Sequence, residues 1–160
     1  MGEWPEPVER VAAVLRGAAV DARIEEFSEG AATARDAARA IGCELAQIVK
    51  SLVFVADGAF VLALVPGDQR ASEGAIRTAA GASDVRVANA GEVMFATGFA
   101  PGGVAPFPLR AVTRTLMDGS FLQFPVVWIG AGTEEYMAAI APQELQRLTR
   151  AATVDLVTPR

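Results

Sequence analysis

The sequence contains no histidine, one lysine and one cysteine among its 160 residues. Without histidine, the common zinc sites and the Ser–His and Cys–His catalytic arrangements are excluded. Cys43 has no second cysteine with which to form an internal disulfide. If the chain is an enzyme, its working groups must be carboxylates, backbone amides, hydroxyls, arginines, the lysine or the substrate itself.

Phosphate-binding glycine motifs are also missing. The chain has neither a Gly-x-Gly-x-x-Gly sequence nor a Walker-type loop. Nucleotide-dependent redox chemistry and phosphoryl transfer therefore lose support. We predict no metal and no cofactor.

Long hydrophobic runs are absent, although 52% of the residues are hydrophobic. The longest runs, such as residues 52–56 and 60–65, stop after a few positions, whereas a spanning helix needs about 20 apolar residues. Residues 1–7 are acidic and contain proline, without the basic and then apolar order of a secretory signal. We therefore expect a cytoplasmic protein without a membrane partner.

The net charge of −5 argues against a protein that wraps long stretches of nucleic acid, because such affinity comes largely from basic residues that neutralise phosphates. We expect no DNA partner, whereas a small local contact with nucleic acid stays open. All basic residues except Lys50 are arginine. A single retained lysine indicates a need for a compact ammonium. The alternative is an ordinary solvated lysine.

Apolar spacing, capping residues and turn signals predict an α/β fold with a mixed, barrel-like sheet of about seven strands flanked by helices. Residues 1–160 are expected to form a single domain, on which the N-terminal helix within residues 1–20 packs. The predicted helices are 7–20, 33–42, 72–80, 90–97 and 142–151. The predicted strands are 23–27, 48–56, 60–65, 85–88, 110–115, 124–129 and 137–140, with 154–157 as a candidate last strand. Asp57-Gly58 is the strongest hairpin signal.

Two segments have the composition of a functional site. Lys50 interrupts an otherwise apolar strand, so it either points outward or reaches into a cavity where its ammonium meets an anion. Residues 97–108 form a loop with prolines on both sides of Gly102-Gly103. Such glycines let backbone N–H groups approach an oxyanion, although glycine and proline are also typical of a simple turn.

Four segments together resemble the YbaK and prolyl-tRNA-synthetase-associated family of aminoacyl-tRNA deacylases. They are residues 48–54 (Ile-Val-Lys-Ser-Leu-Val-Phe), 65–68 (Val-Pro-Gly-Asp), 102–106 followed by Phe107, and 141–145 (Ala-Pro-Gln-Glu-Leu). They occur in the order and approximate spacing of that family. The similarity extends over about residues 20–157.

The resemblance implies a pocket for the aminoacylated terminal adenosine of a tRNA. It implies that Lys50 contacts the substrate near the terminal nucleotide and that Gly102 offers backbone contact to the ester carbonyl. It also implies the acceptor end of tRNA as a partner, with an aminoacyl-tRNA synthetase as a candidate second one. The further residues that we predict to bind the substrate are Ser51, Asp68, Gly103, Val104, Ala105, Pro106, Gly130, Ala131 and Gly132.

The chain departs from the family at two positions. Members that remove alanine carry a histidine after the strand matching residues 124–129, where this chain reads Gly130-Ala131-Gly132, as in members that remove cysteine. Ala105 stands where a hydroxyl residue is common. We expect a substrate-assisted deacylase acting on mischarged tRNA in trans, of the Cys-tRNA(Pro) type. The alternative is a non-catalytic module that binds a nucleotide, aminoacyl-adenosine or a synthetase.

Overall fold

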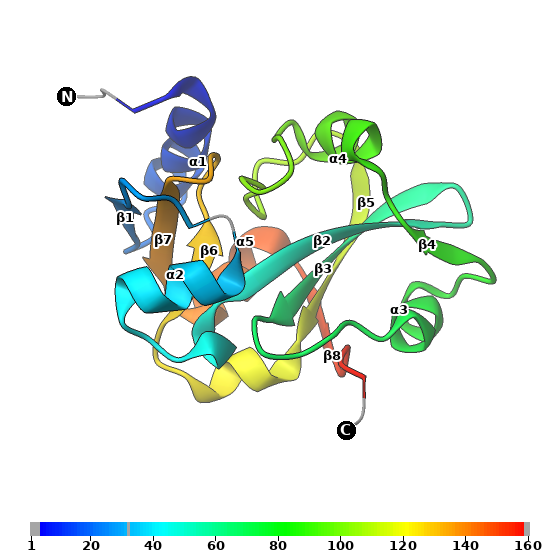
Figure 1. The fold of residues 1–160 in the computed structure, drawn as a ribbon. Helices are drawn as coiled ribbons and strands as arrows, with labels where there is room; N and C mark the ends of the chain where they lie inside the picture. Colours follow the sequence, from blue (N-terminus) through cyan, green and yellow to red (C-terminus); the bar gives the residue numbers. More distant parts are fainter. Residues whose placement is uncertain (1–3, 32, 159–160) are drawn as a thin grey trace.

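The structure, a computed structural model, describes residues 4–31 and 33–158 (Figure 1). Its helices are α1 (Glu6–Gly17), α2 (Ala34–Ile41), α3 (Glu73–Ala80), α4 (Ala90–Thr97) and α5 (Pro142–Thr149), with 3₁₀ turns η1 (Leu45–Gln47) and η2 (Gly119–Gln123). Its strands are β1 (Arg23–Glu26), β2 (Val49–Ala56), β3 (Ala59–Pro66), β4 (Val85–Val87), β5 (Val112–Asp118), β6 (Val127–Gly130), β7 (Tyr136–Ile140) and β8 (Ala152–Val154). The predicted mixed α/β class is confirmed. None of the described helices combines the length and apolar character needed to cross a bilayer.

The strands form two sheets. The larger has the order β4-β2-β3-β5-β8, in which β2 pairs antiparallel with β3 and β4, while β5 pairs parallel with β3 and β8. The smaller, β1-β7-β6, is antiparallel. The predicted barrel-like sheet of about seven strands is not confirmed: the described residues form eight strands in two sheets, without a closed barrel. The sheets approach each other at an isolated bridge between Ile48 and Trp128, and periodicity does not reveal such pairing.

The core lies on both faces of β3. Leu62 and Leu64 are fully buried in the cluster to which the apolar face of α1 belongs. Val61 and Ala63, which alternate with them along the strand, pack in a second cluster with Ile76 of α3. Because successive side chains of a strand leave on opposite faces, a continuous apolar run is the pattern of a strand covered on both sides.

The β2–β3 hairpin is confirmed at Asp57-Gly58. Both residues have positive φ, 49° and 84°, as the tight turn between twisted strands requires. The Asp57 carboxylate accepts the backbone N–H groups of Ser83 (2.9 Å) and Asp84 (2.8 Å). These hydrogen bonds lower the pKa of Asp57 and attach the segment before β4 to the hairpin.

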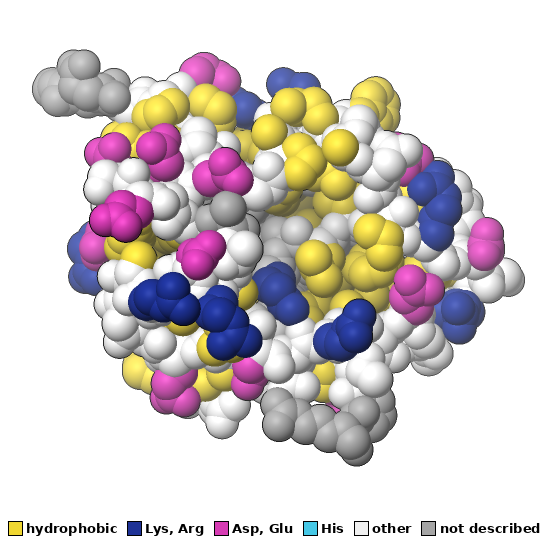
Figure 2. All heavy atoms as spheres, viewed as in Figure 1, with side chains coloured by type: hydrophobic (Ala, Val, Ile, Leu, Met, Phe, Trp, Pro, Cys, Tyr) yellow, Lys and Arg dark blue, Asp and Glu magenta, His cyan; other side chains and the backbone are white. Residues whose placement is uncertain are grey.

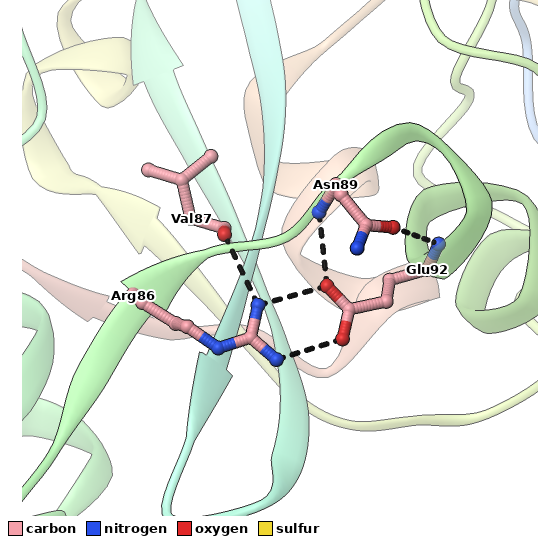
Figure 3. A network of polar contacts seen from close by, with 4 residues as sticks. All are labelled: Arg86, Val87, Asn89 and Glu92. Carbon is pink, nitrogen blue, oxygen red and sulfur yellow. Dashed lines mark hydrogen bonds and ion pairs between the residues drawn. The ribbon is translucent and has the colours of Figure 1, made fainter.

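A polar network joins β4 to α4 (Figure 3). Arg86 donates two hydrogen bonds to the Glu92 carboxylate, at 2.9 and 2.8 Å. Asn89 caps the helix by accepting the Glu92 N–H at 2.8 Å, and Glu92 accepts the Asn89 N–H at 2.9 Å. The Arg86 hydrogen bonds, followed by the Asn89 amide, hold the pKa of Glu92 at about 2. The network ends β4 and turns the chain into α4.

Element boundaries differ from the predictions mainly in the C-terminal half. The strand expected from residue 124 begins at Val127, because residues 119–123 form η2 and Phe124 caps it. The last strand is 152–154 rather than 154–157. Asp118 explains the first difference: its carboxylate accepts the Ser120 N–H at 3.1 Å, which starts a turn that hydrophobicity alone does not signal.

Gly67 permits the close approach of α2 and η1 to the end of β3. A Cβ at this position would lie 2.6 Å from the Leu45 carbonyl oxygen and 3.0 Å from Ala34 Cβ. Backbone cannot yield as a flexible side chain can. The contact therefore fixes the relative positions of three elements around the start of β2.

We expect Gly67→Ala to lower the free energy of unfolding by about 1–3 kcal/mol, because a backbone carbonyl must move. Gly17→Ala is the matched control: no atom lies within 4 Å of its added Cβ, and it should be neutral or stabilising by up to about 1 kcal/mol. Urea unfolding monitored by circular dichroism measures both. Equal stability of the two variants would contradict the packing described at Gly67.

Candidate functional site

A cavity of about 360 Å³ opens where the start of β2 meets α2, the end of β6 and the loop after α4. Figure 2 shows the molecule hollowed near its centre, between α2 and α4 as Figure 1 places them. The lining residues are Ala31, Thr33, Ala34, Ile48, Val49, Lys50, Ser51, Leu52, Gly102, Val104, Gly130 and Met137. A cavity of this volume is within the range of small-ligand sites.

Five of the residues predicted from the sequence meet in this cavity: Lys50, Ser51, Gly102, Val104 and Gly130. They come from three distant stretches of the chain, namely β2, the loop after α4 and the end of β6. The structure therefore brings together the core of the predicted site.

The other predicted residues lie elsewhere. Gly103 and Gly132 line a separate cavity of about 430 Å³ beside α1 and α4. Asp68 lines a third cavity, beside β8 and η2. Ala105, Pro106 and Ala131 are buried, and Ala105 and Ala131 have no exposed surface. A hydroxyl at position 105 would therefore be enclosed in the core, so its lack removes no group from the cavity.

Part of the cavity wall is an uncovered strand edge. β4 pairs with β2 only over residues 54–56, and β6 reaches β2 only at the bridge between Ile48 and Trp128, so the stretch between them, around Ser51, has no paired strand on that side among the described residues. The Val53 carbonyl accepts the Ala88 N–H at 3.0 Å on the β4 side. Because backbone groups of alternate residues point the same way, the N–H and C=O of Ser51 lie on the open edge.

Lys50 is half-buried on β2, opposite Val65 of β3. Its Nζ donates a hydrogen bond of 2.6 Å to the Gln69 carbonyl oxygen. Burial lowers its pKa, the carboxylate of Asp68 opposes that shift, and the charge of Arg70 adds to it. An ammonium has three N–H groups, so two remain for a ligand.

The Ser51 hydroxyl also lacks a partner. Its Oγ is buried and makes no hydrogen bond with any described residue. A buried hydroxyl without a partner carries a desolvation cost. The Oγ has almost no accessible surface, so what Ser51 offers to the cavity that it lines is its edge backbone.

The loop and the turn after β6 pack backbone against backbone. A Cβ on Gly130 would lie 2.5 Å from the Val104 carbonyl oxygen, and one on Gly103 would lie 2.7 Å from the Thr133 Cα. Gly102 has φ of +90°, a conformation that side chains rarely adopt. Among the described residues, the N–H groups of Gly102 and Val104 donate no hydrogen bond. These amides are available to an oxyanion or a carbonyl oxygen.

Sequence reasoning missed several lining residues, notably Thr33, Leu52 and Met137. Thr33 was recognisable only as the cap of α2, where its hydroxyl accepts the Asp36 N–H at 3.0 Å. Met137 and Leu52 are ordinary apolar strand residues, and nothing in their local pattern marks them. No cluster of three or more metal-ligating side chains occurs in the described ranges.

Comparison with known proteins gives one family and several relatives. A family model described as "Aminoacyl-tRNA editing domain" matches residues 28–148. The "Uncharacterized protein YwhH" of Bacillus subtilis is 32% identical over 127 residues, which are 79% of this chain and 80% of that protein. The proline–tRNA ligase of Lactobacillus johnsonii is 33% identical over 90 residues, 56% of this chain but only 16% of the ligase.

A solved structure is similar to this chain over nearly its whole length. It is described as a candidate trans-editing enzyme for prolyl tRNA synthetase and is 34% identical. The superposition covers 98% of this chain and 100% of that chain, with a TM-score of 0.91. The likeness therefore includes the elements that form the cavity.

Lys50 gives a direct test of the electrostatics of the cavity, since it is the only lysine. Lysine labelling will show a single side-chain signal, and its NMR titration should give a pKa below that of free lysine because burial disfavours the charged form. Asp68→Asn should lower this pKa further, and Arg70→Gln should raise it. Shifts in the opposite directions would contradict the arrangement around Nζ.

Proposed function

This chain belongs to the aminoacyl-tRNA editing domain family, and from that premise we propose that it hydrolyses the ester of mischarged aminoacyl-tRNA in trans. The observation that carries the proposal is the convergence of Lys50, Ser51 and the free amides of the Gly102 loop on one cavity. A cation and several hydrogen-bond donors suit a substrate that combines a phosphate, a ribose and an ester carbonyl. In this proposal the reaction takes place in the cytoplasm, where charged tRNA is used.

In this proposal Lys50 binds the terminal nucleotide near its phosphate. The ammonium is held by the Gln69 carbonyl, which leaves N–H groups for an anionic oxygen. Partial burial strengthens such a contact because less water competes for the charge. Lys50 therefore anchors the substrate rather than attacking it.

The N–H groups of Gly102 and Val104 polarise the ester carbonyl. A nucleophile attacks the carbonyl carbon, and these amides stabilise the negative charge that develops on the carbonyl oxygen. The bond from the carbonyl carbon to the ribose oxygen then breaks. The ribose oxygen takes up a proton, so one water is consumed and a free amino acid and tRNA are released. The attacking group is a water, or the thiol of the amino acid, in which case water hydrolyses the resulting thioester in a second step. The neighbouring ribose hydroxyl assists the attacking water and does not itself attack, because its attack would only move the ester from one ribose oxygen to the other. The chain has no histidine that could act as base, which fits substrate assistance.

We propose cysteine on tRNA(Pro) as the substrate. The wall is made of small groups at Ala31, Ala34 and Gly130, which leaves room for a compact side chain. No histidine follows β6, unlike in the alanine-removing members described above. The similarity to proline–tRNA ligases, and to a candidate trans-editing enzyme for prolyl tRNA synthetase, supports the tRNA. A synthetase is the proposed second partner.

The test is a deacylation panel with tRNAs charged with Cys, Ala, Ser, Thr and Pro. We expect Cys-tRNA(Pro) to be hydrolysed fastest and Lys50→Ala to lower kcat/KM by about 100-fold, because a charge-assisted contact is lost. Lys50→Arg should restore only part of this, since the planar guanidinium does not replace a compact ammonium. If no ester is lost faster than in buffer, or Lys50→Ala keeps full activity, the proposal is wrong. Stabilisation by an uncleavable aminoacyl-adenosine without turnover would indicate a binding module instead.

Gly102→Ala tests the loop separately from the lysine. An added Cβ is strained at its φ of +90°, and relaxation of the backbone displaces the amides, whereas the Glu134 side chain, whose Oε2 would lie 2.9 Å away, can move aside. We expect kcat to fall by about tenfold or more. Gly58→Ala is the matched control because it has φ +84° but lies at the hairpin tip with no atom within 4 Å. Equal activity of both variants in the same assay would rule out a role for the loop amides.

A further inference from the structure

Four basic residues lie on or next to the elements around the cavity, and one of them, Lys50, belongs to its lining. Arg35 and Arg39 lie one turn apart on α2, Lys50 is on β2, and Arg70 follows β3. Figure 2 shows dark-blue groups from α2, past the hollow, to the segment between β3 and α3. The influence of Arg70 on the pKa of Lys50 independently places the two side chains near each other. We call these four residues the basic row.

The arginines of the row are free to bind a ligand. Five other arginines form ion pairs with glutamates, whereas Arg35, Arg39 and Arg70 form none within the part of the chain that the structure describes. All three are exposed. Asp36 follows Arg35 in the sequence, and the charge of Asp68 acts on Lys50. The four positive groups of the row therefore outnumber these two negative ones. Arg77, Arg110, Arg114 and Arg150 form no ion pair with a described residue either, so what distinguishes the row is its position around the cavity.

Acidic side chains gather beside the row, on the other side of α2. Glu29, Glu134 and Glu135 line one small cavity with Asp36, and Glu26 and Glu29 line another with Asp36 and Arg39, so α2 stands between the two kinds of charge. Figure 2 shows magenta groups over β1 and above α2 as Figure 1 places them. A polyanion entering the hollow is therefore repelled on one side and attracted on the other.

We infer that the basic row binds the phosphates of the single-stranded 3′ end of an RNA as the strand enters the cavity. This rests on the proposed function, since Lys50 is taken to hold the terminal nucleotide. Guanidinium groups pair with phosphate oxygens in a bidentate manner, and exposed side chains require little desolvation to do so. The row supplies local attraction without a basic protein overall.

The experiment neutralises the arginines singly and together as Arg35→Gln, Arg39→Gln and Arg70→Gln. Arg77→Gln is the matched control, an exposed arginine on α3 that forms no ion pair with any described residue and does not belong to the row. The probe is an uncharged acceptor-stem hairpin with a single-stranded 3′ CCA end, measured by fluorescence anisotropy over a range of salt concentrations. Circular dichroism checks that each variant folds.

We expect each substitution to weaken RNA binding by about fivefold and to reduce the slope of log affinity against log salt by about 0.7, so that the triple variant loses about 2 units. Arg77→Gln should leave both unchanged. In deacylation, kcat/KM of the triple variant should fall for charged tRNA but stay unchanged for aminoacyl-adenosine, which has no phosphate.

Three results would overturn the inference: unchanged RNA affinity, an equal effect of Arg77→Gln, or an equal loss with aminoacyl-adenosine. Unchanged RNA affinity together with lost binding to prolyl-tRNA synthetase would assign the row to a protein partner. The RNA-binding arm uses uncharged RNA, so it decides this inference even if wild type hydrolyses no ester. A wild-type protein that hydrolyses no ester would refute the proposed function alone.

Discussion

The uncovered edge of β2 is the feature on which the rest of the site depends. β4 is only three residues long and pairs with β2 at its far end, so the backbone near Ser51 has no neighbouring strand among the described residues. An exposed edge normally invites pairing with another chain. Here α2, the Gly102 loop and the end of β6 enclose it, and they turn an unpaired edge into one wall of a cavity.

Glycines are what allow the loop to approach that edge. Gly130 and Gly103 let two backbone segments pack within distances that a Cβ would forbid. Gly102 and Val104 line the cavity, and their N–H groups have no acceptors in the described structure. Tight packing on one side and unsatisfied donors on the other are thus two results of one arrangement, which is typical of a preorganised site.

The sequence predicted the parts whose signals are local. The Asp57-Gly58 hairpin, the cap of α2 and the exceptional position of Lys50 depend on neighbouring residues. Strand pairing depends on distant residues, which is why two sheets were mistaken for one. In the Gly102–Pro106 loop, alternate residues enter different environments: Gly102 and Val104 line the cavity, whereas Ala105 is fully buried. A motif marks the whole loop and does not separate these roles.

Charge distribution explains how an acidic protein can serve an RNA substrate. Phosphate attraction depends on the groups within about a Debye length, some 8–10 Å, and not on the total charge. Most of the arginines paired with glutamates lie away from the cavity lining, where their fields largely cancel. The basic row lies around the cavity, and the carboxylates gather beside it on the other side of α2. A partly desolvated ammonium and exposed guanidinium groups then act on one strand. The local asymmetry of charge therefore sets the orientation of the substrate, whereas the net charge sets solubility.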